Sequence, residues 1–242
     1  MEGIKKLGFK KVLNTYFNNS FKTKNVNVII QEFKDIVAPK IEEWKKSNFT
    51  DFNLYSQDEY IYDLFLCYYY CSRPSVLDFI RYCEKNNIPK NINILDDYNG
   101  IGLSTIHLSN AGFTNVYYYN DCSAQVQKLK ELYGKLGLDE PMLVNTIDCK
   151  KYDAVLSFEV IEHYTEPIKH VDNLISVLKD DGLLCITTGF SKIHIGHFPT
   201  YKFTDCELNI KQAGKKVNMY LASNLTYLGK GWNRLPMYYK KG

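Results

Sequence analysis

The segment from Asn93 to Ser104 constrains the fold of this chain most, because an apolar run here ends in two acids and a Gly-x-Gly turn. Gly100 and Gly102 have no Cβ, so the backbone can approach a ligand closely, and the N–H groups of a following helix favour polar or anionic groups. Taken alone, the turn is equally compatible with a tight strand-to-helix connection without a ligand. The sequence predicts a buried strand, this turn, and a helix that stops at Gly112.

Strand-like segments recur after this turn and alternate with helix-like segments. The predicted strands are 116–119, 142–148, 153–158 and 183–188, and the predicted helices are 123–133 and 167–178. Apolar strands joined by short loops through helices indicate a parallel sheet that is covered on both faces. The acids and glycines fall at the carboxyl ends of these strands, which is the edge where open α/β sheets bind ligands.

Asp121 stands at the end of the second predicted strand, about 20 residues beyond the first glycine of the turn. In nucleoside-binding α/β folds, a carboxylate in this place accepts hydrogen bonds from the two ribose hydroxyls. The spacing therefore favours a ligand that contains a nucleoside.

The most specific pattern begins with Tyr152-Asp153-Ala154-Val155 and continues through Glu159-Val160-Ile161-Glu162-His163, Pro167, Gly182 and Leu184 to Thr188. It resembles the fourth and fifth motifs of the class I S-adenosylmethionine-dependent methyltransferases, and the likeness extends from Ile92 to Thr188. The resemblance implies an α/β fold with a mostly parallel, seven-stranded Rossmann-like sheet, helices on both faces and an N-terminal helical extension. It also implies S-adenosylmethionine as the cofactor.

The resemblance assigns roles by position. Asp96 and the two glycines would surround the methionine part of the cofactor, Asp121 would hold the ribose hydroxyls, and Asp148 would face the adenine amino group. Phe158 and Glu159 would line the floor near the sulfonium. The expected cofactor-binding residues are Asp96, Tyr98, Asn99, Gly100, Gly102, Asp121, Cys122, Asp148, Phe158 and Glu159.

The expected catalytic residues are His163 and Glu162. A sulfonium methyl is already electrophilic, so the protein mainly aligns a nucleophile, and a base is needed where that nucleophile carries a proton. The ordinary pKa of histidine suits proton transfer near neutrality, although His163 could equally hold the shape of the motif. We expect no metal here; the alternative is that Glu159, Glu162 and His163 hold a divalent cation with His194 or His197.

Several functions remain open at this stage. The first is a methyltransferase that acts on a small molecule, followed by a nucleic-acid methyltransferase (RNA 2′-O or base), and then by a catalytically inactive protein that binds the cofactor as a partner. A nicotinamide dehydrogenase is disfavoured because Thr105 occupies the third glycine position of its fingerprint.

Residues 1–90 are expected to form a helical cap or lid, and residues 91–242 the cofactor-binding domain. Apolar spacing predicts helices over 26–44, 58–71 and 74–86, with Pro39 kinking or dividing the first and Ser72 capping the last. Aromatic side chains of this part, Tyr55, Tyr60 and Tyr62 among them, could close over the methionine end. The first 24 residues are rich in lysine, which favours either a frayed, solvated terminus or a basic arm that attracts phosphate groups.

After the fifth strand, the segments 216–223, 225–228 and 235–239 have strand-like composition and are expected to complete the sheet. The loop from Gly189 to Phe203 would overhang the active site. The chain lacks an apolar run long enough to span a bilayer, and no membrane association is expected. Seven cysteines, an odd number without C-x-x-C pairs, favour free thiols and a cytoplasmic location.

Overall fold

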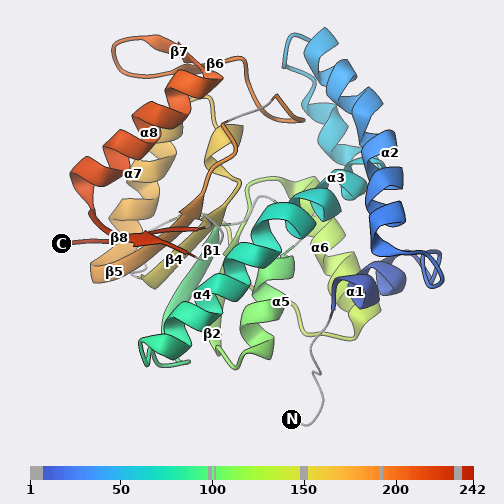
Figure 1. Cartoon of the computed structure of the whole chain (residues 1–242), viewed down its shortest axis with the longest axis horizontal. Coiled ribbons are helices and arrows are strands. Elements are labelled where there is room, and N and C mark those ends of the chain that lie inside the picture. Colours follow the sequence, from blue (N-terminus) through green and yellow to red (C-terminus); the bar gives the residue numbers. More distant parts are fainter. Residues whose placement is uncertain (1–7, 98–99, 101, 148–151, 191–192, 232–235) are drawn as a thin grey trace.

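A computed structural model describes residues 8–97, 100, 102–147, 152–190, 193–231 and 236–242 of the chain (Figure 1). Seven strands form one sheet in the order β3-β2-β1-β4-β5-β9-β8. The first five pair in parallel, and β9 is antiparallel to both of its neighbours. The strands are β1 (Asn93–Asp97), β2 (Asn115–Tyr119), β3 (Met142–Val144), β4 (Tyr152–Phe158), β5 (Leu178–Thr187), β8 (Thr226–Lys230) and β9 (Met237–Lys240). The predicted fold class, including the mostly parallel seven-stranded sheet, is confirmed.

Helices cover both faces of this sheet, because side chains along each inner strand alternate between two hydrophobic clusters. Val116 and Leu156 pack with α4 (Arg73–Lys85) and α5 (Leu103–Asn110). Val155 and Leu184 belong to the other cluster, together with α7 (Pro167–Val177) and α8 (Ile210–Asn224). Figure 1 shows α7 and α8 on one side of the sheet and α4 and α5 on the other.

The N-terminal part consists of α1 (Phe9–Tyr16), α2 (Val26–Lys46), the short 3₁₀ helix η1 (Phe52–Ser56), α3 (Tyr60–Cys67) and the π-helical turn η2 (Tyr68–Ser72), which leads directly into α4. Asn25 caps α2 by accepting a hydrogen bond from the N–H of Asn27. The prediction was that Pro39 kinks or divides this helix, and the helix runs continuously through Pro39, so the second of these alternatives is wrong. Ser72 has helical backbone angles and makes no capping bond, so the predicted cap at Ser72 is wrong as well.

Residues 8–24 are not a frayed terminus. Phe9, Val12 and Leu13 of α1 are buried in the main hydrophobic cluster, and the Phe9 ring stacks with the Tyr68 ring at 6.0 Å. Lys24, one of the basic side chains of this segment, pairs with Glu32 at 2.6 Å. Apolar residues at helical spacing decide the structure here, because their burial outweighs the cost of ordering the terminus.

The C-terminal part differs from its prediction in one element. The segment 216–223, expected as a strand, lies inside α8, which a capping box between Asn209 and Gln212 starts. Ala213, Val217 and Leu221 share one buried face of this helix at helical spacing. The expected strands at 225–228 and 235–239 correspond to β8 and β9 within the described residues.

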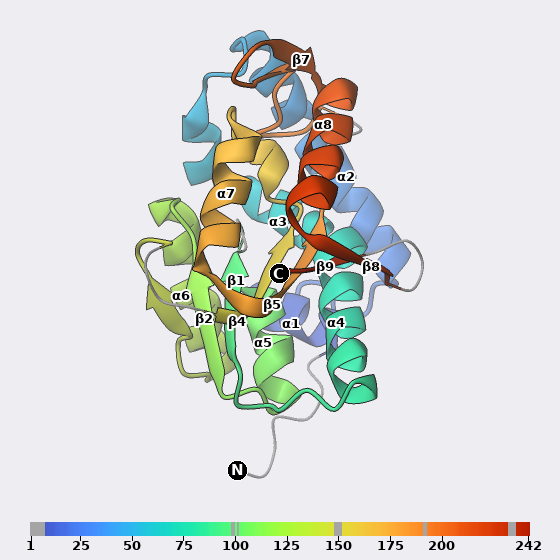
Figure 2. The same ribbon diagram turned by 90° about the vertical axis from the view of Figure 1, so that its left-hand side faces the viewer.

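A small hairpin precedes α8 and consists of β6 (Thr200–Lys202) and β7 (Glu207–Asn209). Figures 1 and 2 both show this hairpin and the C-terminal end of α2 at the same end of the molecule, where the carboxyl ends of the parallel strands lie. One hydrophobic cluster contains Phe33 and Trp44 of the N-terminal part together with Leu129 and Val171 of the sheet region. Among the described residues, no helix is both long and apolar enough to cross a membrane.

Candidate functional site

Asp96 lies at the end of β1 and is fully buried. Its Oδ2 accepts a hydrogen bond of 2.6 Å from the Thr105 hydroxyl, whereas its Oδ1 has no hydrogen-bond partner among the described residues. Burial raises the pKa of the Asp96 carboxyl to about 7, although the Thr105 hydrogen bond opposes this shift. A buried carboxyl with one unpaired oxygen at this edge of the sheet fits a ligand that supplies a donor.

The turn after β1 leads through Gly102, which precedes α5 with a φ of +66°. A Cβ at this position would lie 2.5 Å from Leu129 Cδ1 and 3.7 Å from Tyr118 Cε2. Glycine is therefore required here by the left-handed backbone and by close packing against α6 (Ser123–Leu136). A Cβ at Gly102 would point toward Leu129 of α6, so ligand space is not the reason for glycine at this position. The Gly100 carbonyl accepts hydrogen bonds from the Tyr118 hydroxyl and the Asn120 amide.

Asp121 is exposed just beyond β2 and lines a cavity of about 310 Å³. Cys122 stands beside it at the start of α6, and its N–H donates to Asn120 Oδ1 at 2.8 Å. The Tyr164 hydroxyl donates to Asp121 Oδ2 at 3.1 Å across the cavity wall. The structure thus gives the predicted ribose-binding carboxylate an open approach and one neutral hydrogen-bond donor.

Aromatic side chains from the N-terminal part and from the late loop close this cavity. Phe52 and Tyr55 come from η1, and Phe198 comes from the loop before β6. Of the three tyrosines expected over the cofactor, only Tyr55 lines the cavity. The Tyr60 hydroxyl accepts a hydrogen bond from Gln125, and the Tyr62 ring stacks on Phe17, so both serve packing of the cap.

Glu159 follows β4 with a left-handed backbone, at a φ of +57°. Its N–H donates to both the carbonyl and the hydroxyl oxygen of Thr187 at the end of β5. Left-handed angles are unfavourable for a residue with a Cβ, and functional sites are among the places where such strain is retained. Here they accompany the turn that leads from β4 to Glu162 and His163 in the short 3₁₀ helix η3 (Ile161–His163).

Glu162 is fully buried next to Glu159. Its Oε1 accepts the Gly189 N–H at 2.7 Å, and its Oε2 has no partner among the described residues. A Cβ on Gly189 would lie 2.5 Å from Glu159 Oε2 and 2.5 Å from Glu162 Oε1, which locates both carboxyl groups against the same glycine. Burial raises the pKa of Glu159, and burial together with the Glu159 charge raises the pKa of Glu162 well above its ordinary value.

His163 faces the late loop. Its ring lies edge-on to the His197 ring at 4.8 Å between centroids, and its Nδ1 is buried without a hydrogen-bond partner in the described part of the chain. Burial lowers the pKa of His163 well below its ordinary value, and the nearby His197 and His194 act in the same direction. This shift favours the neutral imidazole, which is the form that accepts a proton or binds a metal ion, and the role of His163 as a base stays a prediction.

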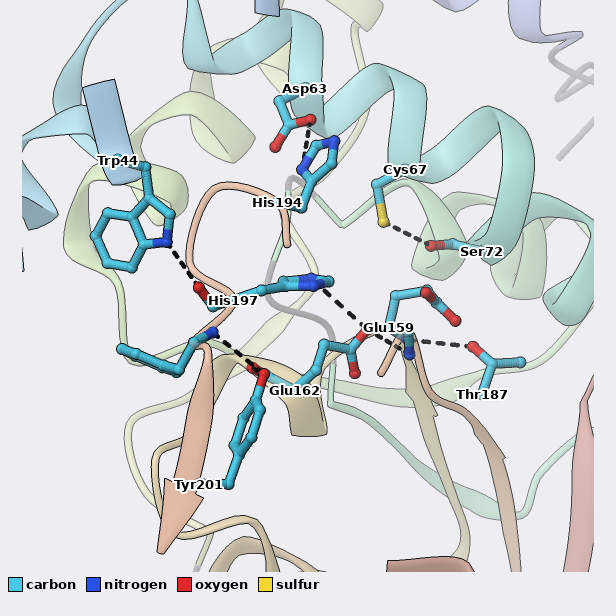
Figure 3. Close-up of polar contacts among 12 residues, drawn as sticks. Trp44, Asp63, Cys67, Ser72, Glu159, Glu162, Thr187, His194, His197 and Tyr201 are labelled. Carbon is cyan, nitrogen blue, oxygen red and sulfur yellow. Dashed lines mark hydrogen bonds and ion pairs between the residues drawn. The ribbon is translucent and has the colours of Figure 1, made fainter. Parts of the chain in front are cut away.

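One ligand atom each from Glu162, His163 and His197 lies within 4.8 Å of the other two, close enough to hold one metal ion. The structure therefore selects His197 over His194 as the histidine that joins this group. His194 turns the other way, and its Nδ1 pairs with Asp63 Oδ1 of α3 at 3.3 Å (Figure 3). Burial lowers the pKa of His194, but the Asp63 carboxylate outweighs it and leaves this pKa above its ordinary value.

Two further side chains hold this loop and were not predicted from the sequence. The Trp44 indole N–H of α2 donates to the His197 carbonyl at 2.7 Å, and the Tyr201 hydroxyl donates to the Glu162 carbonyl at 2.9 Å (Figure 3). Asp63 was also missed, although a charged residue inside the apolar run from Ile61 to Cys71 was a visible signal. Sequence reasoning had no signal for Trp44, because its partner is a backbone atom far along the chain.

A second buried polar group lies beneath the edge of the sheet. Asp97 Oδ2 accepts a hydrogen bond from the Ser157 hydroxyl at 2.8 Å and lies 2.9 Å from His170 Nε2. The His170 ring stacks on the Tyr164 ring at 3.9 Å between centroids. These contacts connect β1, β4 and α7 to the tyrosine that binds Asp121. Asp97, Tyr164 and His170 were not predicted from the sequence as site residues.

The remaining predicted site residues have different outcomes. The Phe158 side chain is buried in the hydrophobic cluster with α4 and α5, so the side chain packs in the core and does not line the 310 Å³ cavity. Tyr98, Asn99 and Asp148 lie outside the described residues, and their roles stay predictions.

Comparisons with known proteins agree with this architecture. The family model described as a methyltransferase domain matches residues 99–186. Magnesium protoporphyrin IX methyltransferase from Synechocystis PCC 6803, solved with bound S-adenosylmethionine, is similar with a TM-score of 0.51 at 15% identity, over 98% of each chain. S-adenosylmethionine-dependent methyltransferases from Clostridium acetobutylicum ATCC 824 and Aquifex aeolicus have TM-scores of 0.48 and 0.47 at 13% and 18% identity. Both cover 70% of this chain, and the alignments cover 91% and 94% of their own chains.

No curated protein matches the chain. The match to the methyltransferase domain covers the glycine turn, β2, β4 and most of β5, which are the elements that carry the motifs. The sheet has one antiparallel strand, β9, which pairs with β5 and β8. Residues 99–186 of this chain therefore match a methyltransferase domain, and the chain has the class I, Rossmann-like fold of the S-adenosylmethionine-dependent methyltransferases.

Proposed function

We propose that the protein binds S-adenosylmethionine at the carboxyl edge of its sheet and transfers the methyl group to an acceptor. The observation that carries this proposal is the exposed Asp121 carboxylate at the end of β2, in the wall of a 310 Å³ cavity that reaches His163. A carboxylate at this position accepts hydrogen bonds from both ribose hydroxyls. The unpaired Oδ1 of Asp96 adds a second acceptor, suited to the amino group of the methionine part.

Bound S-adenosylmethionine would supply an electrophilic methyl group. In the transfer, the lone pair of the acceptor forms a bond to the methyl carbon while the carbon–sulfur bond breaks and its electron pair stays on sulfur. Any proton on the acceptor atom passes to a base. The contribution of the chain is to orient the two molecules and to exclude water, and Phe52, Tyr55 and Phe198, which line the cavity, are suited to this role.

A small molecule is the acceptor class that these residues favour. The side chains that line the 310 Å³ cavity are aromatic, acidic or neutral, and no lysine or arginine is among the described ones. A nucleic acid would need cations along its backbone path. The alternative of an RNA 2′-O or base methyltransferase therefore depends on lysines away from this cavity, and Lys24 among them is already paired with Glu32.

Calorimetric titration with S-adenosylmethionine tests the binding. Asp121→Ala should weaken the affinity by ten- to a hundredfold, because two hydrogen bonds to a charged acceptor are worth about 2–3 kcal/mol together. Asp139→Ala is the matched control, since Asp139 is an exposed acid outside the cavity. Equal affinity of the wild type and Asp121→Ala would remove the ribose assignment, and no binding by the wild type would refute the proposed function.

Transfer of a labelled methyl group to fractionated small molecules, RNA and protein then tests the reaction. We expect label in the small-molecule fraction, with its yield lowered in Asp121→Ala at subsaturating cofactor. Cofactor binding without transfer to any fraction would instead support the inactive partner protein. Label found in RNA would move the nucleic-acid alternative ahead of the small molecule.

A further inference from the structure

The carboxylate and imidazole groups beyond β4 leave two buried polar atoms without partners. Glu162 Oε2 and His163 Nδ1 make no hydrogen bond among the described residues, although Glu162 is fully buried. Each of these atoms loses its hydration shell on folding, and a buried polar group without a partner destabilises the folded state. Both atoms belong to residues whose ligand atoms converge with one from His197 within 4.8 Å.

The carboxyl groups around this point have a weak counterion in His197, whose Nε2 lies 4.0 Å from Glu162 Oε1 and carries a charge only when it is protonated. Glu159 and Glu162 lie against the same glycine, Gly189, and no ion pair with lysine or arginine reaches either of them in the described structure. Two adjacent buried carboxylates repel each other, and the conflict is removed by a shared proton or by a bound cation. A shared proton would satisfy the carboxylates but would leave the Nδ1 of His163 unpaired. A cation satisfies all three groups at once.

We propose that Glu162, His163 and His197 bind one divalent transition-metal cation, with the Glu159 carboxylate beside it. Imidazole nitrogen and carboxylate oxygen together suit manganese, iron, cobalt and zinc. Three protein ligands leave coordination positions open. If the proposed methyltransferase function holds, on which this part rests, those positions favour an acceptor whose reacting atom is a hydroxyl oxygen, because coordination lowers the pKa of a bound hydroxyl.

The N-terminal helices position this site. Trp44 is fully buried in α2, and its indole N–H holds the carbonyl of His197 at 2.7 Å (Figure 3). Tyr201 joins the two halves of the site, because its hydroxyl donates to the Glu162 carbonyl and accepts the Phe198 N–H. Trp44 is therefore a positioning residue: it touches no proposed ligand atom, yet it fixes the backbone from which His197 extends.

Metal binding can be measured on the full chain without any cofactor or acceptor. The protein is treated with chelator and dialysed, and Mn²⁺ is titrated while the electron paramagnetic resonance signal of free Mn²⁺ is followed. Co²⁺ provides a second probe through its visible absorption. We expect one site per chain, with the affinity lowered about 100-fold or more in Glu162→Gln, His163→Gln and His197→Gln, and about tenfold in Trp44→Phe.

His194→Gln is the matched control, because His194 lies in the same loop but pairs with Asp63. It should keep the affinity of the wild type within about twofold, a change far below the effect of losing a ligand or its support. A loss as large as that of His197→Gln would overturn the choice of ligands. Thermal unfolding without metal identifies variants that misfold, and the rise in Tm on adding Mn²⁺ gives a second measure for the variants that fold.

The metal site is refuted if neither Mn²⁺ nor Co²⁺ binds the wild type, or if binding is unchanged in all three ligand variants. The proposed methyltransferase function is tested separately by calorimetry with S-adenosylmethionine in chelator. Metal binding without cofactor binding would keep the site and remove the function. Cofactor binding without metal binding would keep the function and remove the site.

Discussion

The hydroxyl of Tyr164 donates a hydrogen bond to Asp121 Oδ2 at 3.1 Å, the carboxylate to which we assign the ribose of the cofactor. Tyr164 lines both the 310 Å³ cavity and a second cavity of about 350 Å³ on the side of Asn145 and Lys169. Its ring stacks on His170, which Asp97 holds in turn. Ribose hydroxyls that bind Asp121 through the same oxygen therefore compete with the Tyr164 hydroxyl for its lone pairs.

Tyr164→Phe should strengthen the binding of S-adenosylmethionine severalfold, because the competing hydrogen bond is absent while the ring can still stack on His170. The effect is bounded by the worth of one such bond, about 1 kcal/mol, which is about fivefold in affinity. Calorimetric titration at one pH measures it, and Tyr220→Phe is the control, since the Tyr220 hydroxyl binds Asp172 at the surface. Weaker binding by Tyr164→Phe would mean that the hydroxyl contacts the cofactor instead of competing with it.

Gly102→Ala should destabilise the protein even without ligand. The left-handed backbone costs a residue with a Cβ about 1–2 kcal/mol, and the new Cβ would meet Leu129 at 2.5 Å. Denaturant unfolding should show a loss of that size or more. Combining Gly102→Ala with Leu129→Ala separates the two causes. In the Leu129→Ala background the contact with the Leu129 side chain is absent, so the further loss of stability caused by Gly102→Ala there measures the backbone cost alone.

Gly134→Ala provides the control for this prediction. Gly134 lies in α6, and a Cβ there would meet no atom within 4 Å. Alanine should stabilise the helix by up to about 1 kcal/mol. If Gly102→Ala proved as stable as Gly134→Ala, the left-handed turn would not constrain the sequence at this position.

Asp96→Asn should change how stability depends on pH. Burial raises the pKa of Asp96 from 3.8 to about 7, so the folded protein holds this proton more tightly than the unfolded chain does. Its contribution to stability is therefore fully present below pH 4 and is lost as the pH rises to about 7, by up to about 4 kcal/mol. Urea unfolding between pH 4 and 8 should show the wild type losing stability relative to Asp96→Asn, whereas parallel curves would contradict the raised pKa.

Leu13→Ala should lower the free energy of unfolding by about 2–5 kcal/mol, because Leu13 is fully buried in α1 and its truncation leaves a cavity. Lys11→Ala, at an exposed position of the same helix, should change it by less than about 0.5 kcal/mol. Denaturant unfolding of both variants checks the pair. Equal stabilities would restore the frayed terminus that the lysine-rich sequence suggested.

Much of the fold follows from local patterns. A parallel sheet and its ligand-binding edge were predicted from the strand that begins at Asn93, the glycine turn and the apolar segments after it. This was possible because strands that are buried on both faces are apolar along their whole length. The segment 216–223 was misread, since its apolar residues were weighed by composition, whereas Ala213, Val217 and Leu221 follow the helical period. Pro39 does not divide α2, because packing of this helix along its length outweighs one missing hydrogen bond.

The sequence by itself determined which residues could carry chemistry: the acids at the strand ends and the string from Glu159 to His163 are close in sequence to the strands that present them. Only the tertiary structure decided which histidine joins them. No sequence pattern distinguishes His194 from His197. In the structure, His194 pairs with Asp63 of α3, whereas the His197 carbonyl accepts a hydrogen bond from Trp44 of α2. These contacts link segments far apart along the chain, and the free energy that selects them comes from packing of the whole N-terminal part, which no local pattern records.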